Sequence, residues 1–250
     1  MKPIKTLGKA DDIVRLLGVE GALSPAEIAE RIDMPRPSVY RLLDGLAAIG
    51  LTEPAAGGRA QLSRRWLRLA DRARESMAEW RDAGSVLAGL VRETSLTAYL
   101  SVRREHEAVC VDWRQGRGIG VLLLKPGRSL PLNAGAAGRA LLAFDTNADA
   151  YFAAVPERRR FNARTLVEEG ELRADIAATR ARGYSFSDQD VTDGIGAFGV
   201  PVLGGSGEDG RGAVLGVLSL SGIVAEVLEH RERVLAALRE AAQRLGAAQG

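Results

Sequence analysis

The segment from Ser24 to Gly50, SPAEIAERIDMPRPSVYRLLDGLAAIG, has the pattern of two short helices joined by a turn. Ser24 is a favourable N-cap residue, Pro25 suits the first helical position, and Glu27 completes the spacing of a capping box. A break at residues 33–35 ends this helix, and a second helix begins at Arg36 or Pro37 with apolar residues at helical spacing. The segment therefore predicts a pair of packed helices.

The spacing of small and turn residues makes this pair similar to a helix-turn-helix unit. Ala29 lies mid-helix where a second helix can cross closely, Asp33 occupies the turn, and Val39 follows six residues later. The usual turn residue is Gly, and Asp is a departure that still tolerates the left-handed conformation. The alternative is an ordinary helical hairpin with a solvated polar face.

Polar side chains near the start of the second helix are candidates for DNA contact. Arg36 can pair with guanine edges or with phosphates, and hydroxyls such as those of Ser38 and Tyr40 commonly reach phosphate oxygens. Arg41 extends this face as a phosphate anchor. The start of the first helix, Ser24 and Pro25, is included in the predicted DNA-binding set.

A short hairpin after the helices strengthens the DNA-binding interpretation. Residues 51–52 begin a strand, residues 55–58 form a Gly-rich turn, and residues 59–62 return, which is typical of a wing. Arg59 lies beside the tip, where it fits a narrow and strongly negative minor groove. With a helix over residues 5–19, the head is a predicted winged helix-turn-helix domain, residues 1–63.

Charge and cysteine content limit the classes of function. The net charge of the 250 residues is +2, but residues 1–69 hold eleven basic and eight acidic residues, the right sign for a phosphate partner. The single cysteine, Cys110, excludes an intramolecular disulfide and is expected to be a core residue. The sequence has no long apolar run and no apolar N-terminal segment, so we expect no membrane span and a cytoplasmic location.

A helix is predicted after the wing, from residue 64 to residue 80. We assign residues 64–82 as the linker between the two domains. Trp66 and Trp80 would be costly to expose, so we interpret this segment as a connector and a dimer surface. The alternative is packing of both tryptophans within their own domain.

The remainder, residues 83–250, alternates between strands and helices. Strands are predicted over residues 97–102, 108–113, 121–124, 184–186, 197–203 and 212–220, and helices over 148–155, 168–182 and 224–248. Short hairpins mixed with helices favour an α+β domain with an antiparallel sheet. No Gly-rich turn with dinucleotide-binding spacing supports a Rossmann fold.

Two features of this half could bind a ligand. Small residues follow the strand at residues 130–132 and open a helix, so free amides at that helix N-terminus could bind a carboxylate. Close backbone packing explains the small residues equally well. Ser219 and Ser221 alternate with leucines and therefore lie on one face of their strand.

Taken together, these motifs resemble the IclR family of bacterial transcriptional regulators over essentially the whole chain. The resemblance rests on PRPSVYRLLDGLAAIGL, GGRAQLSRRWLRLA, LPLNAGAAGRALLAF, ARGYSFSDQDVTDGIGAFGVPV and LGVLSLSG, in that order. It implies a winged helix-turn-helix head, a linker helix and a GAF-like effector-binding domain. It also implies a dimer, or a dimer of dimers, on a palindromic double-stranded DNA operator.

The resemblance implies a pocket for a small anionic organic effector, such as an organic or aromatic carboxylate. Carried over to this sequence, the implied effector-binding residues are Leu132, Ala136, Ala137, Gly138, Asp190, Ser219 and Ser221. Asp190 stands where the family usually has Glu, Asn133 where His is frequent, and Asp193 beside Gly194 is a further departure. These departures leave the identity of the effector open.

Two other classes of function are the alternatives to a regulator. For an enzyme, the two histidines, His106 and His230, have no nearby nucleophile or carboxylate pair in a plausible motif, and no metal-ligand spacing occurs. We therefore expect no catalytic residue, no metal site and no cofactor. A protein-binding module whose basic head meets an acidic partner is the third interpretation. The operator, the effector and the direction of regulation are not set by the sequence.

Overall fold

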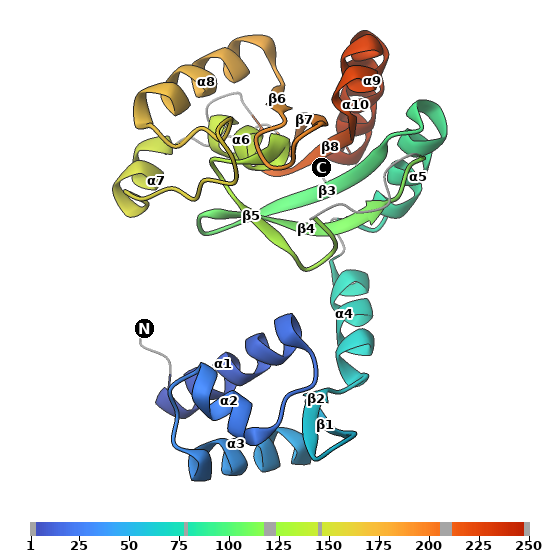
Figure 1. Ribbon diagram of the computed structural model, residues 1–250. Helices are drawn as coiled ribbons and strands as arrows, with labels where there is room; N and C mark the ends of the chain where they lie inside the picture. Colours follow the sequence, from blue (N-terminus) through green and yellow to red (C-terminus); the bar gives the residue numbers. More distant parts are fainter. Residues whose placement is uncertain (1–3, 78–79, 118–123, 145–146, 206–211, 248–250) are drawn as a thin grey trace. The chain divides into compact units, whose positions relative to one another are not determined.

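The computed structural model describes residues 4–77, 80–117, 124–144, 147–205 and 212–247 (Figure 1). The chain divides into two units, Met1–Met77 and Ala78–Gly250. Within the described residues, no helix is both long enough and apolar enough to cross a bilayer.

The N-terminal unit consists of helices closed by a two-stranded hairpin. Its elements are α1 (Lys5–Glu20), α2 (Pro25–Arg31), α3 (Arg36–Ala48), β1 (Thr52–Ala55), β2 (Arg59–Leu62) and α4 (Arg65–Ser76). The apolar positions predicted from helical spacing form its core, with Ile13, Ile28 and Val39 fully buried. Asp33 has a φ of 47°, so the turn between α2 and α3 is left-handed, as predicted.

The helix predicted over residues 64–80 is shorter in the structure, because α4 ends at Ser76. The indole Nε1 of Trp66 donates to the Leu51 carbonyl at 2.7 Å, within the N-terminal unit. Trp80 is buried in the C-terminal unit, where a Cβ added at Gly216 would lie 3.1 Å from its ring. Trp66 is therefore half-buried against the N-terminal unit and Trp80 is buried in the C-terminal unit, while the predicted role of this segment as a dimer surface stays a prediction.

The C-terminal unit is built on an antiparallel sheet with the strand order β5-β4-β3-β8-β7-β6. Its strands are β3 (Thr97–Arg104), β4 (Glu107–Arg114), β5 (Ser129–Pro131), β6 (Ser185–Asp188), β7 (Ile195–Leu203) and β8 (Val214–Ile223). Its helices are α5 (Ala83–Thr94), α6 (Gly135–Phe144), α7 (Ala148–Ala154), α8 (Glu169–Arg182), α9 (Val224–Glu229) and α10 (Arg231–Ala247). The predicted α+β class with an antiparallel sheet is confirmed.

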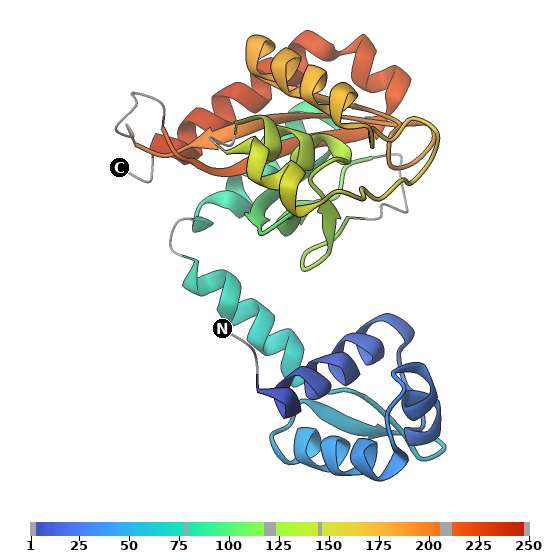
Figure 2. The same cartoon turned by 90° about the vertical axis from the view of Figure 1, so that its left-hand side faces the viewer.

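Helices cover both faces of this sheet (Figure 2). The alternation of residues along β8 shows which helices cover which face. Leu218 and Leu220 lie on the face covered by α5 and α10, and they pair with Leu100 and Ala98 of β3. Ser219 and Ser221 point to the opposite face, where α6 packs and α8 packs on α6. The two serines therefore face α6, not the α5–α10 layer.

Several element boundaries differ from those predicted from the sequence. The strand predicted over residues 121–124 lies almost entirely outside the described residues, and Leu124 is not in a strand. The single helix predicted over residues 224–248 is divided into α9 and α10 at His230. Strand β7 begins at Ile195, two residues earlier than predicted, and strand β8 extends to Ile223.

Candidate functional site

The capping box predicted at the start of α2 is present. The Glu27 carboxylate accepts from the Ser24 amide at 2.8 Å, and the Ser24 hydroxyl accepts from the Glu27 amide at 3.3 Å. These hydrogen bonds hold the pKa of Glu27 below its usual value. Pro25 is the first residue of α2, so the entry to the helix-turn-helix is held rigidly.

The predicted DNA-contact residues of α3 lie on the side opposite its core. Val39, Leu43 and Leu46 are buried, whereas Arg36 and Arg41 are exposed. Tyr40 is also exposed, at 55% of its surface. Ser38 is half-buried, so its reach to a partner is shorter than that of the arginines. The exposed face is therefore basic and carries one aromatic hydroxyl.

The wing presents Arg59 directly after the turn at residues 56–58. Ala55 pairs with Arg59 across the hairpin, and the two glycines at the tip have φ values near 70°. The Arg59 guanidinium lies 4.0 Å from the Glu27 carboxylate, and both side chains are substantially exposed. An exposed ion pair of this length is weak, so Arg59 can exchange it for a phosphate.

A cavity in the C-terminal unit lies between the sheet and the N-terminus of α6. It contains about 570 Å³ of empty space, part of which is open to solvent. Its lining residues are Tyr99, Leu124, Leu130, Gly135, Ala136, Ala137, Ser187, Val191, Thr192, Ile195, Ala197, Ser219 and Ser221. This lining combines hydroxyls with aliphatic side chains and contains no charged residue among the described part of the chain.

Strand register brings the hydroxyls of the sheet together. Ser219 pairs with Tyr99 of β3 on one side and with Gly199 of β7 on the other. Ser221 likewise pairs with Ala197, and directly paired residues point to the same face of a sheet. Burial raises the pKa of the Tyr99 hydroxyl, which therefore stays protonated and able to donate a hydrogen bond.

The N-terminus of α6 reaches this row of hydroxyls because Gly199 has no side chain. A Cβ at Gly199 would lie 2.9 Å from the Ala136 carbonyl oxygen, and the Ser185 hydroxyl donates to that same oxygen at 2.6 Å. The first amides of a helix have no intrahelical acceptor. The Gly135 amide donates to the Asp190 carboxylate at 3.0 Å, whereas the Ala136 and Ala137 amides have no acceptor among the described residues.

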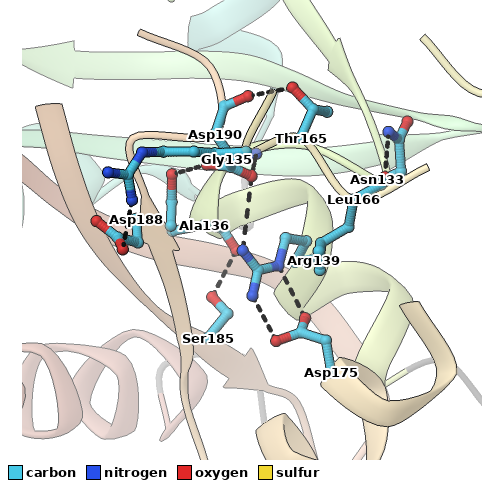
Figure 3. Close-up of polar contacts among 12 residues, drawn as sticks. Asn133, Gly135, Ala136, Arg139, Thr165, Leu166, Asp175, Ser185, Asp188 and Asp190 are labelled. Carbon is cyan, nitrogen blue, oxygen red and sulfur yellow. Dashed lines mark hydrogen bonds and ion pairs between the residues drawn. The ribbon is translucent and has the colours of Figure 1, made fainter. Parts of the chain in front are cut away.

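Asp190 belongs to a buried polar network behind the cavity (Figure 3). Its carboxylate accepts from the Gly135 amide and the Ser187 hydroxyl, and it lies 3.5 Å from the Arg139 guanidinium. Arg139 also forms a bidentate pair with Asp175 of α8, with 2.8 Å between Nε and Oδ2. Burial alone would lower the pKa of Arg139, but the hydrogen bond to Asp175 and the two acidic charges raise it.

Three of the predicted effector-binding residues do not line the cavity. Leu132 is fully buried in the core between the sheet, α6 and α8. Gly138 is packed against the backbone of the segment before α6, since an added Cβ would lie 2.8 Å from the Pro131 carbonyl oxygen. Asp190 is 1% exposed and caps α6 instead of facing the cavity.

The cavity is lined by the other four predicted residues, Ala136, Ala137, Ser219 and Ser221. Of the small residues at the start of α6, Ala136 and Ala137 therefore face the cavity, whereas Gly138 allows close backbone packing. Sequence reasoning missed Tyr99, Ser187 and Thr192 as lining residues. Tyr99 could have been found from the alternation along residues 97–101 once β3 was paired with β8. Of the departures from the family pattern, Asn133 donates to two carbonyls, and Asp193 accepts from the Asn162 side chain at 3.1 Å.

Comparisons with known proteins match most of the chain in both units. Residues 6–55 match the model described as IclR helix-turn-helix domain, and residues 75–247 match that described as bacterial transcriptional regulator IclR C-terminal. The HTH-type transcriptional regulator BhcR of Paracoccus denitrificans is 28% identical, over 95% of this chain and 86% of its own.

Solved structures share the fold. The crystal structure of an IclR transcriptional regulator from Alicyclobacillus acidocaldarius has a TM-score of 0.85 at 24% identity and covers both chains completely. An IclR homolog from Microbacterium hydrocarbonoxydans, crystallised in complex with 4-hydroxybenzoate, has a TM-score of 0.81 at 20% identity and covers 98% of this chain and 99% of its own.

Proposed function

The chain belongs to the IclR family of bacterial transcriptional regulators, and from that premise we propose that a small carboxylate bound in the cavity of the C-terminal unit controls its binding to an operator. The family assigns it a DNA-binding helix-turn-helix and a C-terminal effector domain, and its relatives are regulators, not enzymes. The finer proposal concerns the chemistry of the effector, the operator and the residues that contact each.

One observation carries the effector proposal: two amides without acceptors lie in the same cavity as a row of hydroxyls. The Ala136 and Ala137 amides at the positive end of α6 suit one carboxylate, because helix N-termini favour anions. Tyr99, Ser219 and Ser221 offer hydroxyl donors on the facing sheet. Aliphatic side chains line the rest, so the body of the effector is apolar. The 4-hydroxybenzoate bound by the Microbacterium homolog has this composition.

For the DNA side, we propose that α3 enters the major groove and the wing reaches the adjacent minor groove. Arg36, Ser38 and Tyr40 lie at the start of α3, where recognition helices contact base edges. Arg41 and Arg59 supply phosphate contacts. Ser24 and Pro25, at the start of α2, fix the position of that helix against the DNA backbone. Arg36→Ala should then relax sequence preference, whereas Arg59→Ala should weaken all duplexes about equally and reduce the salt slope.

A palindromic operator requires two heads, so we propose that the protein works as a dimer or a dimer of dimers in the cytoplasm, where bacterial DNA lies. Leu67 of α4 is 69% exposed and Val19 of α1 is 86% exposed. We propose that these two exposed side chains are buried when two copies of the chain associate. Their replacement by Glu should lower the sedimentation coefficient toward that of a monomer and weaken operator binding.

Binding of the purified protein to DNA upstream of its own gene tests the proposal, with benzoate, benzamide and benzyl alcohol as matched ligands. We expect salt-dependent specific binding that benzoate changes and the two neutral analogues do not. Ser219→Ala should weaken the benzoate effect without changing DNA binding in its absence. An equal response to all three ligands would contradict the carboxylate. Equal loss of specificity in Arg36→Ala and Arg59→Ala would contradict the assigned roles in DNA binding.

A further inference from the structure

Four buried polar atoms gather around Tyr151, away from the effector cavity. Within the described residues, five buried side-chain nitrogen or oxygen atoms have no hydrogen-bond partner, and four of them belong to this cluster. They are His106 Nδ1, Asn133 Oδ1, the Tyr151 hydroxyl and Arg158 Nε; the Asn133 backbone and the Arg158 side chain approach the Tyr151 hydroxyl and partly offset the rise in its pKa that burial causes, without forming a hydrogen bond of normal geometry. Buried polar atoms are nearly always paired with protein or with ordered water, so four unpaired atoms in one place require an explanation.

Contacts with Tyr151 and its neighbours define the cluster. The rings of His106 and Tyr151 have centroids 6.1 Å apart, and the Arg158 guanidinium carbon lies 6.0 Å from the centre of the Tyr151 ring. The Asn133 side chain donates to the carbonyl of Arg159, the residue after Arg158, at 3.1 Å. Tyr151 and Asn133 are fully buried, and the Arg158 side chain is 5% exposed.

The orientation of the Asn133 amide is fixed by its own hydrogen bonds. Its Nδ2 donates to the carbonyls of Arg159 and Leu166, at 3.1 and 2.9 Å, so the atom left without a partner is the oxygen. That oxygen can only accept a hydrogen bond, whereas Arg158 Nε can only donate one. The Tyr151 hydroxyl and His106 Nδ1 can serve either way.

We propose that this cluster is an internal hydration site that binds one or more ordered water molecules. A ligand for all four atoms must both donate and accept, and water does so with two to four partners at buried sites. An anion without a proton, such as chloride or bromide, would suit Arg158 and Tyr151 but cannot donate to the Asn133 oxygen. Because the Asn133 oxygen needs a hydrogen-bond donor, the cluster favours water over such an anion as its ligand.

The site joins four segments of the effector unit. His106 lies between β3 and β4, Tyr151 in α7, and Arg158 in the segment that follows α7. Asn133 stands two residues before Gly135, where α6 begins and the effector cavity is lined. Through Asn133, bound water would therefore contact the segment that leads into α6.

A crystal structure of the full chain grown in bromide tests the proposal. We expect water oxygens at about 3 Å from at least three of the four atoms, and no anomalous bromide signal among them. A bromide peak in the cluster would show that the site binds an anion and would refute the hydration site. Direct pairing of the four atoms with one another would also overturn the hydration site.

Replacing Tyr151 gives an independent test in solution. If its hydroxyl binds buried water, Tyr151→Phe should lower Tm by about 2–4 °C, the shift that loss of one hydrogen bond gives in a unit of this size. Tyr184→Phe is the matched control, because the Tyr184 hydroxyl accepts from Arg231 and its loss should lower Tm comparably. An unchanged or raised Tm in Tyr151→Phe alone would refute the proposal, since removal of a truly unpaired buried hydroxyl costs nothing.

Discussion

Asp190→Asn is the substitution that most directly tests the structural role assigned to the buried carboxylate. Asp190 is 1% exposed and accepts hydrogen bonds from the Gly135 amide and the Ser187 hydroxyl beside the Arg139 guanidinium. Asparagine keeps the shape but presents an NH₂ group where three donors point. At least one donor loses its acceptor, and the charge that faces Arg139 is removed.

The expected cost follows from these contacts. Hydrogen bonds to a charged group contribute about 1.5–3 kcal/mol each, and an unsatisfied buried donor costs about 1–3 kcal/mol. Arg139 retains its bidentate pair with Asp175, which limits the electrostatic loss. We therefore expect a loss of about 2–4 kcal/mol in the free energy of unfolding of the C-terminal unit, measured by urea denaturation.

Asp188→Asn is the matched control for this experiment. Asp188 lies two residues earlier and pairs with Arg164 at 3.3 Å, with both side chains about half exposed. Exposed ion pairs contribute about 0–1 kcal/mol, so this variant should be nearly as stable as the original protein. Equal effects of the two substitutions, or a loss below about 1 kcal/mol in Asp190→Asn, would refute the assignment of Asp190 as the buried cap of α6.

Three further outcomes are expected. Hydrogen bonds with Ser24 lower the pKa of Glu27, so the stability that Glu27 contributes is present above about pH 4.5 and is lost as the pH falls through the lowered pKa. Unfolding of Ser24→Ala followed by circular dichroism should therefore depend less on acid pH. Loss of the N-cap itself should lower the free energy of unfolding by about 1 kcal/mol. Burial raises the pKa of the Cys110 thiol to about 12, so iodoacetamide at pH 8 should modify the unfolded chain and spare the native one. Gly199→Ala should cost about 1–3 kcal/mol in thermal unfolding because the new Cβ meets helix backbone, whereas Gly170→Ala, which meets nothing within 4 Å, should not destabilise.

Local rules predicted the head of this protein well. The capping box needs only residues three apart, and the left-handed Asp33 turn follows from the short polar side chain of Asp. The wing follows from two glycines between short strands. Each of these features depends on neighbours in the sequence, which is why a single chain sufficed to predict them.

The cavity depended on contacts that local patterns do not encode. The Gly135 amide and the Asp190 carboxylate are 55 residues apart, and the pairing of Tyr99 with Ser219 spans 120 positions. The family resemblance implies Asp190 as an effector-binding residue because a resemblance assigns a position and not the direction of its side chain. Leu132 lies outside the cavity lining because its side chain packs into the core with residues of α6 and α8.

The charge balance of the network restricts what the cavity can hold. Arg139 and Arg182 lie within 4 Å of Asp175, and Arg139 also faces Asp190, so two arginines balance two carboxylates. The network thus supplies no spare positive charge to a ligand, and none of the residues described as lining the cavity is basic. An effector carboxylate is left with the partial positive charge at the start of α6, about half an elementary charge. This favours one carboxylate over two, and tighter binding of phthalate than of benzoate would contradict the argument.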